Sequence, residues 1–241
     1  MKWLQKILIS LLFPLLFLSC QKEIIQDSEF DTLGNSAKQL LSSSSFSTLY
    51  VDLNYMPGHE PDATTLTNLS DFLKTHINKP NGIFVRKNAV AGSGKTQLSL
   101  SELVKLEKDY RTTYTYGDVI AVHILITDTD YKEEDIFAVS YWNTSFCLFG
   151  KTIAENSGRP GQVGRQQLYT TLLQHEFGNL MGLVDQGSPM QQPHRDHTNG
   201  AHCKNTSCLM YYGIETDAGR AATVPVLDAA CRADLKANGG K

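Results

Sequence analysis

The sequence lacks a strong excess of charge of one sign, a long apolar run and an internal repeat. Its 241 residues include 22 Lys and Arg against 25 Asp and Glu, which leaves a net charge of -3 at pH 7. This near balance gives no sign of a nucleic-acid partner. The 41% of hydrophobic residues suits one globular domain of moderate size, with or without a tail. No repeat is visible, so a repeat architecture is not expected.

The N-terminus has the pattern of a signal peptide. Lys2 and Lys6 precede an apolar run over residues 7–18, which is too short to span a bilayer. The run ends in the sequence LFLSC at residues 16–20, which resembles a bacterial lipobox. This resemblance implies that Cys20 is the lipidated first residue of the mature chain. The alternative is an ordinary secretion signal in which the cysteine is incidental.

The lipobox-like pattern predicts an anchor in a lipid bilayer. We expect residues 1–19 to be removed as a lipoprotein signal peptide, and an acyl group on Cys20 to hold the chain at the membrane, since each buried methylene contributes about 0.8 kcal/mol. The following residues 21–23, QKE, resemble the export tag of Bacteroidetes surface lipoproteins. The expected location is the cell envelope, at the outer membrane. Residues 20–45 are polar and end in four serines, which is typical of a flexible tether, with a short helix near residues 37–41 as an alternative.

Residues 46–241 are expected to form a single mixed α/β domain. Alternating or continuous apolar runs predict strands, and apolar spacing of three and four predicts helices. The predicted order is strand, helix, strand, helix, three strands and a final helix, at residues 48–55, 62–76, 83–85, 101–110, 119–127, 137–141, 145–153 and 166–182.

Residues 89–96, AVAGSGKT, come within one residue of a nucleotide-binding P-loop. A P-loop needs a helix that begins at its Lys-Thr, because the amides and the helix dipole bind the phosphates. Here the better helix start is Ser99 or Ser101, several residues later. We therefore interpret the segment as a surface loop and predict no nucleotide partner.

The predicted helix at residues 166–182 carries an incomplete zinc-binding motif. Two histidines four residues apart on a helix can hold zinc, and a glutamate after the first reaches the metal-bound water as general base. His175 and Glu176 are present, but Asn179 stands in the place of the second histidine. Helical spacing puts these three residues on one face with Leu172, which is expected to border a cleft.

A second group of residues follows the helix in a fixed order. Gly182 comes first, His202 directly precedes Cys203, and Met210 lies two residues after Cys208. This order resembles the metzincin metallopeptidases and, among them, the archaemetzincins. The resemblance implies a zincin-like fold with a mixed twisted sheet, an active-site helix and a Met-turn. In that fold Met210 would be the Met-turn residue beneath a zinc ion.

The third zinc ligand has more than one candidate. Between Gly182 and His202 lie 19 residues, where the archaemetzincin pattern has two. The additional segment brings His194, and Asp185 stands where other metzincins place their third ligand. The neighbouring Cys203 anchors the comparison and favours His202, while His194 and Asp185 remain alternatives.

Asn179 decides how well the site can hold zinc. An amide oxygen is a poorer zinc donor than an imidazole nitrogen, so weaker binding is expected. The stretch also resembles exported zincin-like lipoproteins of Bacteroidetes, whose pattern has histidine at this position. By that resemblance, Asn179 is a local loss.

The cysteines after the helix have two interpretations. The archaemetzincin pattern places a Cys-x-x-Cys pair 17 residues after the methionine region, and here the corresponding residues are Asp228 and Cys231. The resemblance therefore implies a structural zinc held by Cys203, Cys208, Asp228 and Cys231. In an oxidising compartment a disulfide between two of the cysteines is the alternative.

The sequence thus predicts a membrane-anchored zinc metallopeptidase that cleaves extended peptides, with Glu176 as general base. His175 and His202 would be ligands of Zn²⁺, and a peptide or protein substrate would lie along the sheet edge. The alternative is an inactive zincin-fold binding lipoprotein, in which Asn179 cannot hold the metal.

Overall fold

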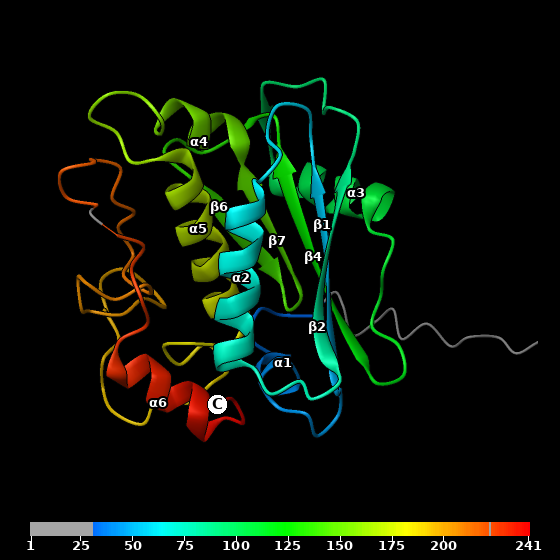
Figure 1. The fold of residues 1–241 in the computed structure, drawn as a ribbon, viewed down its shortest axis with the longest axis vertical. Coiled ribbons are helices and arrows are strands. Elements are labelled where there is room, and N and C mark those ends of the chain that lie inside the picture. The colour runs from blue at the N-terminus through cyan, green and yellow to red at the C-terminus, as the bar shows by residue number, and fades with distance from the viewer. Residues whose placement is uncertain (1–30, 222) are drawn as a thin grey trace, which may run out of the picture.

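The computed structural model describes residues 31–221 and 223–241, and the predicted signal peptide and Cys20 lie outside them. The described residues form thirteen helices and strands (Figure 1). In chain order these are α1 (Ala37–Leu41), β1 (Thr48–Tyr55), α2 (Ala63–His76), β2 (Gly82–Ala89), β3 (Gln97–Leu98), α3 (Leu100–Tyr110), β4 (Val119–Thr127), β5 (Asp130–Tyr131), β6 (Ala138–Trp142), β7 (Ser145–Phe149), α4 (Gly150–Glu155), α5 (Arg165–Leu180) and α6 (Ala229–Ala237).

Five strands form one mainly parallel sheet in the order β2-β1-β4-β7-β6. The first three neighbouring pairs are parallel, and β6 pairs antiparallel with β7 at the edge. The strand β4 is buried along almost its whole length, as its run of apolar residues predicts. This mixed α/β arrangement is the one that the sequence predicts. Within the described residues, no helix is long and apolar enough to cross a membrane.

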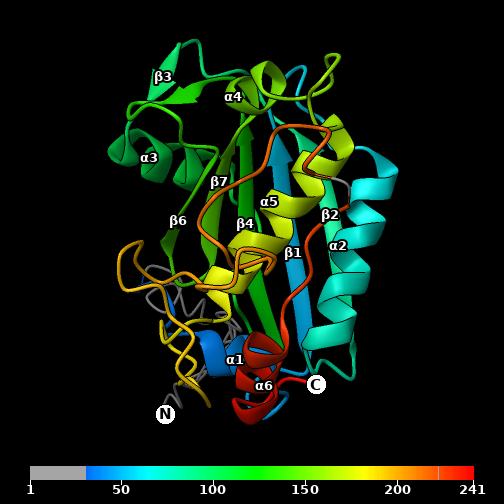
Figure 2. The same cartoon turned by 90° about the vertical axis from the view of Figure 1, so that its left-hand side faces the viewer.

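The two faces of the sheet are covered by different helices (Figures 1 and 2). The helices α2 and α5 pack on one face, where Leu73 and Leu173 meet Val51 and Val122 in the main core. The helix α3 packs on the other face, in a smaller core that includes Leu103. Because α5 lies beside the edge strand β6, its remaining face is free to border a cleft.

The predicted strand at residues 145–153 is too long. The strand β7 ends at Phe149, and the helix α4 begins at Gly150. A Cβ atom at Gly150 would lie 2.4 Å from both the ring of His59 and the carbonyl oxygen of Thr127. The chain therefore turns sharply at a glycine pressed against its neighbours, a tertiary contact that local apolar pattern does not reveal.

The helix α3 begins after Ser99, as predicted. Glu102 accepts from the backbone N–H of Ser99 at 2.8 Å in a capping box. The P-loop-like residues before it fold back on the sheet instead, because Ser93 donates its hydroxyl to Asp128 at 2.6 Å. The Lys-Thr of that segment therefore does not begin a helix.

Residues 31–45, the described part of the predicted tether, contain the short helix expected near residues 37–41, but they pack against the domain and do not form a flexible linker. In α1 the side chains of Leu40 and Leu41 are fully buried in the main core. Gly34 packs so closely on the backbone of Gln186 that no side chain would fit there. Apolar burial offsets the polar composition of this stretch, so the folded domain begins before α1.

Lys79 fastens this N-terminal segment to the domain. Its buried ammonium donates to the backbone carbonyls of Gln39, Ser42 and Phe46 at 2.6, 2.5 and 2.7 Å. Burial lowers the pKa of Lys79 to about 8. An apolar side chain at position 79 could not donate to these three carbonyls, so the contact requires lysine.

Replacing Lys79 by methionine is expected to lower the free energy of unfolding by about 3 kcal/mol, because buried carbonyls lose their donor. Urea unfolding measures the change. The matched control is Lys38→Met, since Lys38 lies exposed on α1 and its replacement is expected to stay within about 0.5 kcal/mol. Equal stability of the two variants would contradict a fastening role for Lys79.

Candidate active site and cysteine cluster

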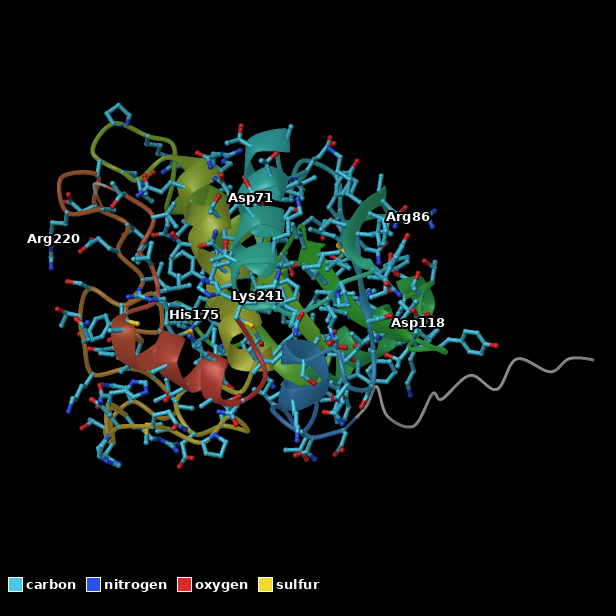
Figure 3. All side chains as sticks on the ribbon, turned by 60° about the horizontal axis from the view of Figure 1, so that its bottom comes forward. Asp71, Arg86, Asp118, His175, Arg220 and Lys241 are labelled. Carbon is cyan, nitrogen blue, oxygen red and sulfur yellow. The ribbon has the colours of Figure 1, made fainter. Side chains whose placement is uncertain are left out.

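A cavity of about 720 Å³ lies between α5, the edge strand β6 and the loops after α5; we call it the cleft. Leu172, His175, Glu176 and Asn179 of α5 all line it, which confirms the predicted helix face. The opposite face of α5 packs on the sheet, where the rings of Phe177 and Phe146 meet edge to face at 5.5 Å. Figure 3 shows His175 where α5 meets the loops that follow it.

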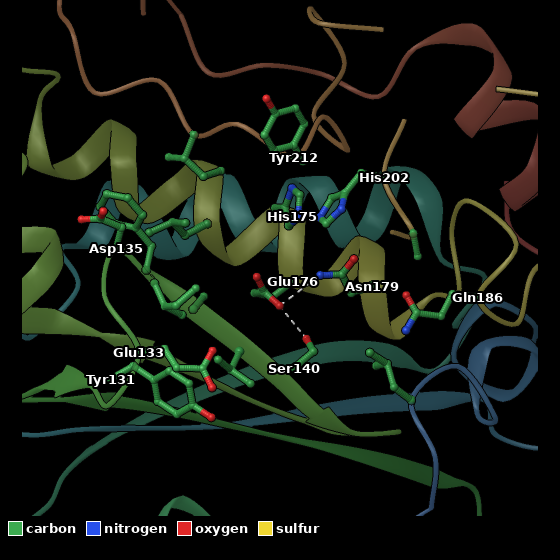
Figure 4. A pocket seen from close by; sticks show the side chains of 18 residues that line it. Tyr131, Glu133, Asp135, Ser140, His175, Glu176, Asn179, Gln186, His202 and Tyr212 are labelled. Atoms are coloured by element: carbon green, nitrogen blue, oxygen red, sulfur yellow. Dashed lines mark hydrogen bonds between the residues drawn. The ribbon is translucent and has the colours of Figure 1, made fainter. Parts of the chain in front are cut away.

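His175 and His202 come together at the cleft although 26 residues lie between them in sequence. Their rings stack with centroids 5.4 Å apart (Figure 4). The Nδ1 of His175 bonds to the carbonyl oxygen of Leu209 at 2.8 Å, and the Nδ1 of His202 bonds to that of Asn199 at 2.5 Å. A carbonyl only accepts, so each Nδ1 carries a proton, and Nε2 is the nitrogen of each ring that is left to bind a metal ion.

The environment favours the neutral form of His202. Burial lowers the pKa of this imidazole, and the neighbouring His175 lowers it further. A neutral imidazole with its lone pair on Nε2 is the form that binds a metal ion, and the carbonyl bond on the other nitrogen fixes the ring orientation. The pair of histidines is therefore arranged as two metal ligands.

Glu176 lies beside the histidines with its carboxylate bound by two donors. Its Oε2 accepts from the hydroxyl of Ser140 at 2.6 Å and from the amide of Asn179 at 3.1 Å (Figure 4). Ser140 belongs to β6, so the edge strand and the helix together hold the carboxylate. The contact with Ser140 was not predicted, because it depends on how β6 lies against α5.

Asn179 completes the donor set imperfectly. Its amide nitrogen is committed to Glu176, which leaves its amide oxygen as the atom that can face a cation. In Figure 4 that oxygen points to the side on which His175 and His202 lie. Two imidazole nitrogens and one amide oxygen fit a zinc ion, although the oxygen is the weakest of the three donors.

Met210 packs against α5 at Gly178. The residue is fully buried, and a Cβ atom at Gly178 would lie 2.2 Å from its sulfur. The glycine therefore lets the methionine approach the helix just behind His175. The backbone of Met210 also joins the neighbouring loop, because its carbonyl accepts from the N–H of Cys203 at 2.7 Å.

The two alternative third ligands do not line the cleft. Asp185 is exposed, in a turn where Val184 and Asp185 both have positive φ values of 59° and 64°. His194 is buried in a different place, where its Nε2 bonds to the carboxylate of Asp234 at 2.7 Å. Of the three candidates, the structure brings only His202 to His175.

His194 instead joins three cysteines and a carboxylate in what we call the cysteine cluster. The ligand atoms of His194, Cys203, Asp228 and Cys231 all lie within 4.8 Å of one another, and the sulfur of Cys208 lies 3.6 Å from that of Cys231. All the described cysteines are free thiols. This arrangement favours the metal interpretation of these residues over the disulfide.

The distances within the cysteine cluster suit one tetrahedral ion. Zinc–sulfur bonds of about 2.3 Å in a tetrahedron place two sulfurs about 3.8 Å apart. The Nδ1 of His194 lies 3.4 Å from the sulfur of Cys203 and 3.8 Å from that of Cys231. The 3.6 Å between the sulfurs of Cys208 and Cys231 is close to the same spacing, so each of these pairs suits two ligands of one metal ion.

Asp228 lies in the cluster, as the sequence predicts, and it also caps a helix. Its Oδ1 caps α6 by accepting from the N–H of Cys231 at 2.9 Å, and its Oδ2 accepts from Asn205 at 3.0 Å. Backbone and side-chain donors lower the pKa of this carboxyl below its ordinary value against the opposing effect of burial. Asp228 therefore belongs to the cluster and also fixes the start of α6, while His194 adds a donor that the sequence did not assign to this group.

The cluster favours one thiolate over the others. A hydrogen bond from Cys231, helped by the backbone N–H groups of Asp228 and Met210, lowers the pKa of Cys208 to about 6. Burial raises the pKa of Cys203 to about 12, and the hydrogen bond to Cys208 raises that of Cys231. Metal ions bind cysteine as the thiolate, so a metal ion that binds these neighbouring thiols would displace their protons.

The cluster and the cleft share two short loops. Cys203 follows His202 directly, and Cys208 precedes Leu209, whose carbonyl orients His175. Whatever holds the two cysteines therefore also holds both histidines of the cleft. The link through His202 follows from the sequence order, whereas the link from Leu209 to His175 is a tertiary contact.

Among the comparisons with known proteins, the comparison with solved structures supports this fold. No protein-family model matches the chain, and no curated protein matches it. The crystal structure of archaemetzincin from Methanopyrus kandleri is similar, with a TM-score of 0.54 and 14% sequence identity. The match covers 80% of this chain and 96% of that one. At this identity the likeness shows the fold alone, which is the predicted zincin-like α/β fold.

Proposed function

We propose that the protein is a zinc-dependent peptidase with its active site in the cleft. The observation that carries this proposal is the pair of imidazoles, His175 and His202, each with its Nδ1 on a backbone carbonyl and with Glu176 beside them. His175, His202 and the amide oxygen of Asn179 would hold the ion. A bound zinc ion would polarise the scissile carbonyl and lower the pKa of water towards about 7.

The chain's own residues supply the remaining steps. The Glu176 carboxylate accepts the proton of the attacking water, and the Ser140 hydroxyl keeps that carboxylate in place. The strand β6 lies at the edge of the sheet, and its residues Ala138 and Val139 line the cleft. An extended peptide can pair with this edge and present its backbone to Glu176.

We propose a structural role for a second zinc ion in the cysteine cluster. Cys203, Cys208, Cys231 and His194 would be its ligands, and Asp234 would orient the imidazole of His194 through the 2.7 Å bond to Nε2. This ion would fix the loops that carry His202 and Leu209. We also retain the proposal, from the N-terminal sequence, that an acylated Cys20 anchors the chain in the cell envelope.

A second candidate function is that of an inactive binding protein with the same fold. The observation that favours it is the hydrogen bond from Asn179 to Glu176, which engages the proposed general base. Asn179 also stands where the zinc-binding motif has its second histidine. In this alternative the cleft binds peptides without cleaving them. Zinc content separates the two candidates.

We expect Asn179→His to raise zinc affinity of the cleft about a hundredfold, because an imidazole replaces an amide oxygen. Zinc per chain is measured by elemental analysis after dialysis against a graded chelator. The unmodified protein is expected to hold two zinc ions and to hydrolyse peptides, and His175→Ala to lose one ion.

The matched control for these histidine changes is His197→Ala, since His197 is exposed and does not line the cleft. It is expected to keep both ions. If the unmodified protein holds zinc only in the cysteine cluster and gains the second ion on Asn179→His, the inactive alternative is correct.

A further inference from the structure

One wall of the cleft carries carboxylates on an otherwise apolar surface. The loop between β5 and β6 contributes Glu133 and Asp135, and the neighbouring Ile136 and Phe137 are also lining residues. In Figure 4 the Glu133 carboxylate lies beside the hydroxyl of Tyr131, on the same side of the cavity. Both acids lie away from His175 and His202, which belong to α5 and a later loop (Figure 4).

The wall is not neutralised by other side chains. Neither Glu133 nor Asp135 pairs with a cation in the described part of the chain. Among the described residues that line the cleft, none is a lysine or arginine. Burial raises the pKa of Tyr131, and the nearby Glu133 raises it further, which places that carboxylate close to the tyrosine hydroxyl. The wall therefore has unmatched negative charge.

We propose, resting on the proposed peptidase function, that the cleft selects peptides with a lysine or arginine side chain near the scissile bond. Glu133 and Asp135 lie apart in the cleft (Figure 4), so each binds the cationic end of a basic side chain at its own position along the peptide. The aliphatic part of the side chain packs on Ile136 and Phe137, as long basic side chains do on apolar surface. The ring of Tyr131 offers a further favourable contact for a cation.

The loop holds Asp135 in a defined position. Its φ of 60° lies in the left-handed region, which is unusual for a residue other than glycine and is best tolerated by aspartate and asparagine. Asp135→Asn therefore removes the charge without changing the backbone. Glu133→Gln does the same for the exposed neighbour, so the double variant isolates charge from shape.

The test measures peptide binding to the full chain carrying Glu176→Gln, with zinc present, so that no peptide is cleaved. Fluorescence anisotropy compares end-blocked peptides that differ only in one residue, lysine, glutamine or glutamate, placed at each position in turn. We expect the lysine peptide to bind about tenfold more tightly than the glutamine peptide at its best position. The preference should weaken in 0.5 M salt, because exposed charges are screened.

Adding Glu133→Gln and Asp135→Asn is expected to bring the lysine and glutamine peptides within about twofold of each other. The matched control is Glu134→Gln, an exposed acid in the same loop that does not line the cleft, which should keep the preference. Equal binding of both peptides to the parent protein would overturn this specificity while leaving peptide binding intact. If no peptide binds the parent and none is cleaved by the unmodified protein, the proposed function itself is wrong.

Discussion

Replacing Glu176 by glutamine is expected to lower the rate of peptide hydrolysis about a thousandfold, while zinc content and folding stay unchanged. Glutamine has the shape of glutamate, and its amide oxygen can still accept from the hydroxyl of Ser140, which lies 2.6 Å from the carboxylate. It cannot take up the proton of an attacking water. The loss therefore reports on proton transfer and not on the structure of the cleft.

The control for this substitution is Ser140→Ala. It removes one of the two donors to Glu176 but leaves the amide of Asn179 at 3.1 Å, so a loss of about tenfold or less is expected. If the unmodified protein is too weak to assay, both changes are made in the Asn179→His protein. Hydrolysis that survives Glu176→Gln at the original rate would sink the proposed mechanism.

The helix face that borders the cleft could be predicted because it depends only on local periodicity. Leu172, His175, Glu176 and Asn179 share one side of any α-helix drawn through them, and the structure places all four in the cleft. Small residues were equally informative. Gly178 allowed the close approach of another segment, and that segment is Met210.

The position of His194 could not be predicted in the same way. It lies in a loop of 19 residues between Gly182 and His202, and neither apolar spacing nor turn residues fix where such a loop folds. Its partner Asp234, on α6, is 40 residues away in sequence. One signal was present: the cysteine pattern lacks a thiolate, and the additional segment brings a histidine that can replace it.

The N-terminal boundary shows a related limit. Residues 31–45 are polar enough to resemble a linker, yet α1 buries Ala37, Leu40 and Leu41. What makes the helix part of the domain is Lys79, which satisfies three carbonyls of the segment from a distant loop. The composition of residues 31–45 shows how polar the segment is. Whether the segment packs on the domain depends on residues elsewhere in the chain, such as Lys79.

The second large effect is expected in the cysteine cluster rather than in the cleft. Replacing Cys231 by serine is expected to release the cluster's zinc ion, because a serine hydroxyl stays protonated and binds zinc poorly. The free energy of unfolding should fall by about 4 kcal/mol, a decrease of about 10 °C in Tm. Both zinc content and thermal unfolding are measured, with and without added zinc.

The control is Cys147→Ala, which removes a buried thiol from β7, on the sheet face covered by α3. It is expected to cost stability but to keep the zinc. Cys231→Ser differs in a further way, because Cys203 and Cys208 would lose the ion that fixes their loops. His202 and the carbonyl of Leu209 move with those loops, so peptide hydrolysis should fall with the zinc. A Cys231→Ser protein that keeps its full zinc content and Tm would show that Cys231 does not bind the metal ion.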